Sequence, residues 1–536
     1  MKKIQYLLLF VLILSFSYCA KKGRPSGGPK DEDAPLFVTA DPPYETLNFD
    51  KKEIKIYFNE YITLKDLNKQ LVISPPLNPA NPSLITPQGS PSKYINIKLL
   101  DTLQENTTYT FDFGNSVQDN NEGNKLERFK YVFSTGNYID SLNLRGSVKN
   151  SYSSDAIKDI KLLLYRLDTS YTDSAVYKVK PNYVASTLDS SNYSFSNLKD
   201  GKYFLFALKD KASDYLFDPR IDEIGFYKDT ISLPRDSVIT DIISIFKEVL
   251  PYKFRRAKEE RKGQLIFGYE GNAKDLKVAI LSDVPEDFKT ISFFAKDSDT
   301  LNLWHTPIER DSLVFKVSKN DIVDTVTVKL RKKKLDSLTI SSDVRGIIDY
   351  KDTLFFSSNN PIIKIDTSKV SFVDKDTLKI SYTPFISEKE NKIGFLFDKD
   401  FESFYTIDIY PGALTDIFNY SNDSIQTKFR TKSIEDYGDI TISVQNPQAK
   451  PVIIQLTDQN DNTITQQKTN KTENILFRYL IPKTYKIRII YDENNNGKWD
   501  TGNFLDKKQA EVVEYYSEVQ EVRANWSLNA IITIKE

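Results

Sequence analysis

Apolar and polar residues alternate at period two through most of this chain. The alternation is clear at 53–58, 94–99, 324–328 and 484–489, where Ile, Val, Tyr and Thr recur at every second position. Such a pattern is typical of strands with one buried face and one solvent face. Clusters of Asp, Asn, Ser, Gly and Pro interrupt it about every ten residues, which is the spacing of antiparallel sandwiches. The sequence therefore predicts an all-β fold.

Length, charge and histidine content narrow the classes of function. A chain of 536 residues predicts several domains, at roughly 100 to 150 residues each. With 73 basic and 74 acidic residues the net charge is −1, so we expect no nucleic-acid partner. The sequence has no glycine-rich phosphate loop, and we expect no nucleotide. Its single histidine, His305, excludes a multi-histidine metal site. We expect His305 to be structural and the protein not to be an enzyme.

The N-terminus has the form of an export signal that ends at the only cysteine. Lys2 and Lys3 precede an apolar run at 4–16, which is too short for a comfortable membrane span. Cys19 follows this run, at the place where a lipoprotein signal puts the thiol that receives diacylglycerol. Residues 19–35 are rich in Gly, Pro and charge, which predicts a flexible tether. We expect Cys19 to be lipidated and the lipid to hold the protein on a membrane; the alternative is a free thiol in a discarded signal.

Two stretches of the chain recur in the same order, which indicates an internal repeat. The pattern Tyr-Thr-x-Asp-x at 109–113 returns at 405–409, and each copy is followed by a second unit. The second units run into Asp-rich segments that begin at Asp210 and Asp492. The expected organisation is a signal peptide at 1–18, a tether at 19–35, module A at 36–138, module B at 139–250, a charged linker at 251–261, module C at 262–338, module A′ at 339–434 and module B′ at 435–536.

Several motifs of module A resemble those of a known family. Residues 58–61, 103–110, 119–124 and 133–136 are similar to the bacterial Ig-like domain of the S-layer-protein SbsA type. Module A′ resembles a divergent copy, and modules B and B′ resemble transthyretin-like or carboxypeptidase-regulatory-like sandwiches. The leader is similar to that of Ig-like-domain lipoproteins of Bacteroidota-type bacteria. The resemblance implies an outer-membrane lipoprotein on the periplasmic or cell-surface face, with no assigned catalytic residues.

The segment that begins at Asp492 has the spacing of the first part of an EF-hand-like calcium loop. Gly497 stands at the sixth position, where the turn is sharp, but Asn503 stands at the twelfth, where a bidentate Glu is expected. The candidate ligands are Asp492, Asn494, Asn496, the main-chain carbonyl of Lys498, and Asp500. An Asx-rich turn without an ion is the alternative, since Asn-Gly is a standard hairpin signal. Module B has Tyr215 at the glycine position and is a poorer candidate. We expect no other cofactor.

Triplets of Asp, then Ser or Thr, then an apolar residue recur along the chain. They resemble the acceptor motif for O-glycosylation in envelope proteins of this type, which would place sugars on exposed turns. A turn Asp before the first residues of a strand gives the same triplet, so both interpretations stay open. The triplets begin at Asp101, Asp140, Asp173, Asp311, Asp336, Asp352 and Asp376.

Three functions remain compatible with the sequence. The leading hypothesis is a non-enzymatic, lipid-anchored scaffold or accessory binding subunit of the envelope, with an envelope protein as its partner. The alternative is a surface glycan-binding or adhesion protein, which predicts a row of solvent-exposed aromatic rings on one sheet face. A carboxylate-dependent glycoside hydrolase is the remote alternative, and it needs two acids roughly 5 to 9 Å apart in a cleft.

Overall fold

The computed structural model describes residues 31–535 apart from 79, 170 and 297. The predicted signal peptide, Cys19 and most of the predicted tether lie outside the described residues. Strands dominate the described chain, and its helices are short turns such as α2 (Leu67–Gln70) and α3 (Ala175–Lys178). The predicted all-β fold is confirmed. Among the described helices, none has the length and apolar content needed to cross a membrane.

Module A is a sandwich whose two sheets share one core. The core includes Ile56, Ile95, Phe111 and Phe133, all fully buried. The larger sheet has the order β1 (Phe37–Asp41), β2 (Glu53–Leu64), β5 (Ser92–Lys98) and β4 (Leu84–Thr86), with β7 (Val117–Asp119) paired to β2. The smaller sheet has the order β3 (Val72–Ser74), β6 (Thr108–Asp112) and β8 (Lys130–Ser134).

Module B also has two sheets, and its larger sheet is covered on both faces. The larger sheet has the order β11 (Tyr183–Ser186), β10 (Lys161–Arg166), β13 (Gly201–Lys209) and β14 (Glu223–Phe226), with β15 (Ile231–Leu233) paired to β13. The smaller sheet has the order β12 (Asn192–Leu198), β9 (Leu142–Asn150) and β16 (Ile243–Ile245). Leu162 and Leu164 face the inner core, whereas Leu163 and Phe206 face a second cluster that contains residues of modules A and B′.

Module C is a smaller sandwich with a core around Phe267, Leu303 and Phe315. One sheet has the order β17 (Lys253–Arg261), β18 (Gln264–Glu270), β21 (Thr300–His305) and β20 (Thr290–Phe294). The other has the order β19 (Lys277–Ile280), β22 (Ser312–Lys319) and β23 (Ile322–Lys329). His305 is fully buried, its Nδ1 lies 2.8 Å from the carbonyl of Thr306, and its ring stacks on Phe288. Burial lowers the pKa of His305.

The predicted linker at 251–261 is wrong, because most of it is strand β17. This strand pairs with β18 from Lys253 to Arg261. It lies at the edge of its sheet, and Glu259 is its one fully buried residue. Charged side chains on an edge strand keep its free backbone groups from pairing with other chains, so an edge strand need not alternate. The charge run is therefore the first strand of module C.

Module A′ has a core that includes Phe356, Phe395 and Ile407. One sheet has the order β24 (Ile340–Ser342), β26 (Leu354–Ser358), β30 (Lys392–Phe397) and β29 (Tyr382–Ile386). The other has the order β25 (Gly346–Ile348), β33 (Ile425–Thr431), β31 (Phe404–Ile409) and β28 (Val370–Asp374). The strands β27 (Ile362–Ile365) and β32 (Leu414–Asp416) pair with each other.

Module B′ repeats the sheet topology of module B. Its smaller sheet has the order β37 (Glu473–Leu480), β34 (Gly438–Gln445) and β41 (Ser527–Thr533). Its larger sheet has the order β36 (Thr463–Thr469), β35 (Val452–Thr457), β38 (Thr484–Tyr491) and β39 (Val513–Tyr515), with β40 (Gln520–Glu521) paired to β38. In both modules the last strand of the smaller sheet is parallel to the first, as β16 is to β9 and β41 is to β34.

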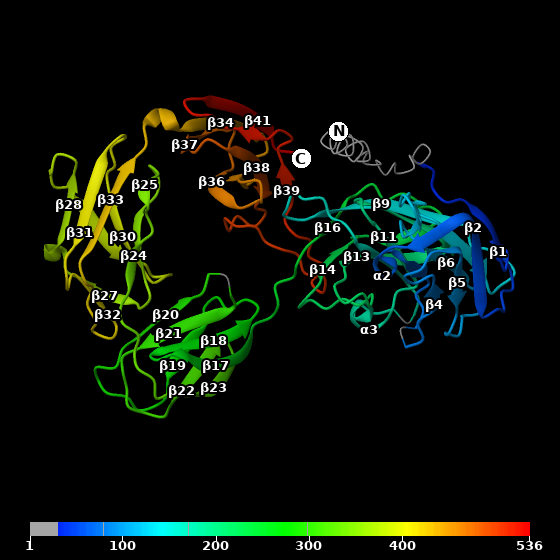
Figure 1. Cartoon of the computed structure of the whole chain (residues 1–536), viewed down its shortest axis with the longest axis horizontal. Coiled ribbons are helices and arrows are strands. Elements are labelled where there is room, and N and C mark those ends of the chain that lie inside the picture. Colours follow the sequence, from blue (N-terminus) through cyan, green and yellow to red (C-terminus); the bar gives the residue numbers. More distant parts are fainter. Residues whose placement is uncertain (1–30, 79, 170, 297, 536) are drawn as a thin grey trace, which may run out of the picture.

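Modules B, C, A′ and B′ follow one another around a ring, in which an extended stretch of chain joins B to C and the C-terminal module comes back to module B (Figure 1). Modules A and B meet where Val184 N–H donates to Ser74 Oγ. Modules C and A′ share a cluster that includes Trp304 and Phe418. Modules A′ and B′ meet at tyrosine side chains: the backbone N–H of Tyr350 in module A′ donates to the Oη of Tyr437 in module B′. The ring closes where module B′ docks on module B.

Candidate functional site

The loop from Asp492 to Val512 joins β38 to β39 and begins with the predicted calcium residues. Asp492 is buried, and its two carboxylate oxygens accept from the backbone N–H groups of Asn496 (2.9 Å) and Gly497 (2.7 Å). Asn495 and Gly497 have φ values of 55° and 80°, in the region that Gly and Asn tolerate best. Asp492 therefore organises a tight turn, as an Asx-rich segment predicts.

The remaining predicted residues gather around Asp500. The Oδ1 atoms of Asn494 and Asn496 accept from backbone N–H groups two residues on, while both Nδ2 groups donate to Asp500 Oδ2. Lys498 reaches Asp500 Oδ1 with its ammonium, 3.0 Å away. The five predicted residues thus lie in one loop. Asn503, at the twelfth position, does not join this cluster and forms an isolated β-bridge with Lys508.

One residue of this site, Glu511, was missed by the sequence analysis. Its side chain is 4% exposed, and Oε2 accepts from the backbone N–H of Asp500 at 2.9 Å. The backbone N–H of Asn494 also stabilises the charged form of the Glu511 carboxylate. The other oxygen, Oε1, is buried and no donor of the described chain makes a hydrogen bond to it. Burial, and then the nearby Asp500 and Asp492, raise the pKa of Glu511. Glu511 lies far along the chain from Asp492, and only the pairing of β39 with β38 brings it back.

In the part of the chain that the structure describes, carboxylates alone do not build a metal centre. Within residues 31–535, with the gaps stated above, no three His, Cys, Asp or Glu side chains form a group that could hold a metal ion. An ion in this loop would therefore depend on amide and main-chain oxygens as well as on carboxylates, as calcium sites do.

The matching loop of module B has the same turn but no unsatisfied oxygen. Asp210 accepts from the N–H groups of Ser213 (2.6 Å) and Tyr215 (2.7 Å), and Tyr215 has a φ of 61° where module B′ has Gly497. Asp222 takes the place of Glu511. Its two oxygens accept from Lys211 N–H and from Asp218 N–H, both at 2.9 Å. The loop of module B is complete without an ion.

The second half of the 492–512 loop docks on module B. The ring of Trp499 packs on Tyr152, with centroids 4.7 Å apart. Phe504 is fully buried in the outer cluster of the larger sheet of module B, with its centroid 4.9 Å from that of Phe206. Polar contacts add to this: Thr501 Oγ1 donates to the carbonyl of Lys247 (2.7 Å), and Phe504 N–H donates to Glu248 Oε1 (2.6 Å). The loop is thus the docking element between the two modules.

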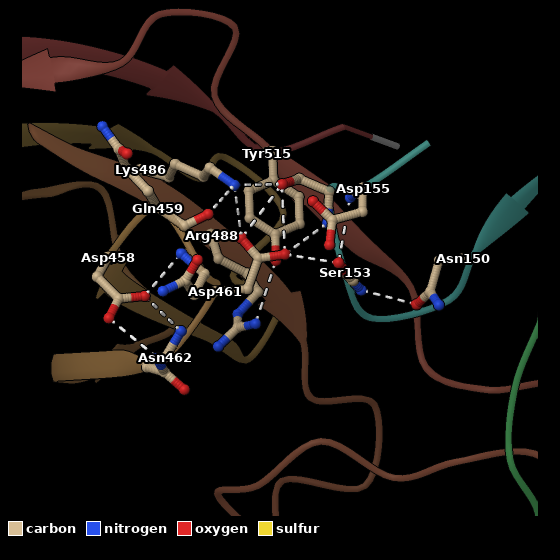
Figure 2. A network of polar contacts seen from close by, with 12 residues as sticks. Asn150, Ser153, Asp155, Asp458, Gln459, Asp461, Asn462, Lys486, Arg488 and Tyr515 are labelled. Atoms are coloured by element: carbon tan, nitrogen blue, oxygen red, sulfur yellow. Dashed lines mark hydrogen bonds and ion pairs between the residues drawn. The ribbon is translucent and has the colours of Figure 1, made fainter. Parts of the chain in front are cut away.

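A polar network reinforces the same interface (Figure 2). Asp461, at the β35–β36 turn of module B′, accepts from Ser153 Oγ (2.7 Å) and from Ser154 N–H (2.9 Å), both in module B. Lys486 Nζ lies 2.9 Å from Asp461 Oδ1. Burial raises the pKa of Asp461, but the donors from Ser153 and Lys486 outweigh it and lower that pKa to about 2.

The pH dependence of stability should report this network. A carboxylate with a folded pKa of about 2 and an unperturbed pKa of 3.8 contributes about 2 kcal/mol. That contribution is present above pH 4 and is lost as pH falls toward about 2. We expect Asp461→Asn to flatten the pH dependence of the denaturant midpoint in that window. Ser153→Ala with Ser154→Ala should remove only the share due to the two hydroxyl donors of module B, because the backbone N–H of Ser154 is kept. An Asp461→Asn profile identical to wild type would contradict this role.

Beside this network lies a buried arginine, Arg488, at the centre of the interface. It is fully buried, and it donates to Gln455 Oε1 (2.7 Å), Thr463 Oγ1 (2.9 Å) and Tyr515 Oη (3.1 Å). Its guanidinium carbon lies 4.1 Å from the ring centroid of Tyr152 in module B. A planar guanidinium suits this position, because it can donate in its plane and stack on a ring face at the same time.

The other features named by the sequence lie away from this loop. A groove between modules B and B′ is lined by two acids, Asp155 and Glu514, and Lys535 pairs with Glu514 at 2.7 Å. In five of the seven triplets the hydroxyl residue is exposed, and Ser312 and Thr353 are half-buried. The exposed hydroxyl residues are Thr102, Ser141, Ser174, Ser337 and Thr377.

Comparison with known proteins gives one family match and several weak structural likenesses. Residues 31–135 match the family of bacterial Ig-like domains, which covers module A. The S-layer protein rSbsC is 14% identical, over 88% of this chain and 67% of its own, with a TM-score of 0.15. Native alpha-2-macroglobulin from Escherichia coli is 11% identical, over 34% and 91%, with a TM-score of 0.17.

A pilin is also among the similar structures. BcpA, the major pilin subunit of Bacillus cereus, is 10% identical, over 73% of this chain and 99% of its own, with a TM-score of 0.13. At TM-scores this low, these likenesses support no inference about function. No curated protein matches the chain significantly.

Proposed function

We propose that this chain is a non-enzymatic, lipid-anchored protein of the bacterial envelope that acts as a scaffold or accessory binding subunit. The observation that carries the proposal is the docking of module B′ on module B through Trp499, Phe504 and Asp461. Docking fixes consecutive sandwich modules relative to one another. Their loops and edge strands then have fixed positions at which partners can bind. The bacterial Ig-like match of module A supports this class of role.

The proposed anchor is a lipid on Cys19, in the outer membrane, with the modules on its periplasmic or cell-surface face. At the start of the described chain, Asn124 Nδ2 of module A donates to the carbonyl of Asp31 at 2.9 Å. Module A would therefore lie nearest the membrane. Replacing Cys19 by serine should release the protein from washed membranes and abolish incorporation of labelled fatty acid; unchanged membrane retention and labelling would exclude the lipid anchor.

The scaffold role is tested by cross-linking mass spectrometry on the full chain in its own membranes. We expect a reproducible protein neighbour cross-linked to lysines of more than one module. The Cys19→Ser protein is the matched control, because it keeps every module and loses the proposed location. Recovery of no neighbour from intact membranes would argue against a scaffold.

One observation favours the glycan-binding alternative. Three tyrosines lie on the outer face of the larger sheet of module A, at Tyr57, Tyr61 and Tyr94. The rings of Tyr57 and Tyr94 are 5.6 Å apart, and Tyr61 is 56% exposed with the ammonium of Lys93 over its ring. Exposed rings in a row can stack on sugar faces.

A glycan array with the full chain tests this alternative. Tyr61→Ala and Tyr94→Ala should each remove the bound glycan signal. Tyr138→Ala is the control, since Tyr138 is also in module A, is 52% exposed and lies outside the row. An array without signal, or signal unchanged in both variants, would exclude this surface as a sugar platform.

A further inference from the structure

The docking loop of module B′ holds a buried carboxylate oxygen that no donor satisfies. Glu511 is 4% exposed; its Oε2 accepts from Asp500 N–H and the N–H of Asn494 also acts on its carboxylate, while among the described residues no donor makes a well-formed hydrogen bond to Oε1. An ionised carboxylate oxygen is costly to bury without a partner. The position therefore calls for a positively charged or proton-bearing partner.

Two further carboxylates lie in the same loop as Glu511, although the three side chains do not by themselves form a group that could hold a metal ion. Asp492 and Asp500 both act on Glu511 electrostatically, and Asp492 is itself buried. Two ammonium groups lie at this loop: Lys498 contacts Asp500 with a side chain that is 71% exposed, and Lys468 lies against Gly497. A cation bound between Asp492, Asp500 and Glu511 would offset the repulsion among their negative charges.

The loop of module B shows that the turn alone does not create this deficit. It has the same Asp-centred turn at Asp210, but both oxygens of Asp222 accept backbone hydrogen bonds. Its Asp218 is paired with the guanidinium of Arg220. One chain therefore contains a satisfied copy and an unsatisfied copy of the same loop. The difference lies in Glu511 and in the amides at Asn494 and Asn496.

We propose that the 492–511 loop is a calcium site in which Glu511 supplies the carboxylate that the twelfth loop position lacks. The ligands would be Asp492, Asn494, Asn496, the main-chain carbonyl of Lys498, Asp500 and Glu511. All are oxygen donors, which suits calcium with its six to eight oxygen ligands and does not suit metals that prefer imidazole or thiolate. The amide Nδ2 groups of Asn494 and Asn496 and the ammonium of Lys498 contact Asp500, and a bound ion would replace these contacts.

The position of this site links the ion to docking. Asp500 and Glu511 flank the segment that inserts Phe504 into module B, and the indole N–H of Trp499 donates to the Glu511 carbonyl at 3.0 Å. An ion that binds both flanks fixes the two ends of the docking segment. Calcium would therefore stabilise the docked state, by an amount that grows with the logarithm of the calcium concentration once that concentration exceeds the Kd.

Calcium binding to the full mature chain is the direct test. We expect one Ca²⁺ per chain by calorimetry, with a Kd of about 10⁻⁴ to 10⁻³ M, as in extracellular modules. Terbium should bind at the same place and luminesce on excitation of Trp499. Glu511→Gln should weaken calcium by at least about tenfold, because it removes the charged oxygen but keeps an acceptor for Asp500 N–H. Asp222→Asn, its counterpart in module B, should leave calcium affinity unchanged.

Thermal unfolding gives a second readout that does not depend on one variant folding well. Calcium should raise the unfolding temperature of the wild-type chain, and a chelator should reverse the rise. Asp492→Ala should remove the rise whatever its own starting stability. The proposal is overturned if millimolar calcium neither binds nor shifts unfolding. It is also overturned if Glu511→Gln binds calcium as tightly as the wild type.

Discussion

Replacing Phe504 by alanine is expected to release module B′ from module B while both modules stay folded. The ring is fully buried among Phe206, Phe226 and Tyr177 of module B, at centroid distances of 4.9, 5.5 and 6.4 Å. Truncating a buried Phe costs about 3 to 5 kcal/mol, through lost burial and the cavity left behind. Because the contact joins segments over 250 residues apart, it must also offset a closure entropy that grows with loop length.

Small-angle scattering measures the expected opening as a larger radius of gyration. Leu505→Ala is the matched control, because Leu505 is the next residue in the chain and is 60% exposed. The inner core of module B′ does not contain Phe504, so its own unfolding transition should persist in the variant. A scattering curve that Phe504→Ala leaves unchanged would show that docking rests on other contacts.

The strands could be predicted from the sequence because alternation is a local property. In β34 the residues alternate between buried and half-buried almost without exception, and the sequence alternates with them. The Asx turn at Asp492 was equally predictable, since its acceptor and its donors lie within five residues of one another. Local hydrogen bonding and local hydropathy suffice for both features.

The strand β17 could not be predicted from alternation, because it lies at a sheet edge. Its run of Lys, Arg and Glu leaves both faces largely open to solvent, so hydropathy gives no period. Charge on an edge strand and charge in a linker look the same in one sequence. The strand becomes visible only once β18 is seen to pair with it along its length.

The sequence did contain a sign of the docking interface: two strands interrupt the alternation with continuous apolar runs. In β10 and β35, consecutive apolar residues are buried on both faces, as at Leu162 to Tyr165 and Val452 to Ile454. A continuous apolar run predicts a strand covered twice. Here the second cover comes from another module. Glu511, by contrast, had no local signal, since its partner Asp500 lies across a loop that only β39 closes.

Arg488→Ala should be the most destabilising substitution in module B′. Arg488 donates hydrogen bonds to three side-chain acceptors. Its loss would leave the buried Oε1 of Gln455 without its closest donor. Breaking such a buried charged network costs about 3 to 5 kcal/mol. The stack on Tyr152 of module B would also be lost, so docking should weaken together with the fold of the module.

Urea unfolding of the variants separates these contributions. Arg488→Lys keeps the charge but not the planar fork, so it should recover little stability. Arg478→Ala, an exposed arginine on β37, should change stability by less than about 0.5 kcal/mol. Tyr152→Ala should weaken docking and leave the unfolding transition of module B′ in place, because Tyr152 belongs to module B. If Arg488→Lys is as stable as the wild type, a positive charge alone is enough to stabilise this position, and the planar guanidinium is not required.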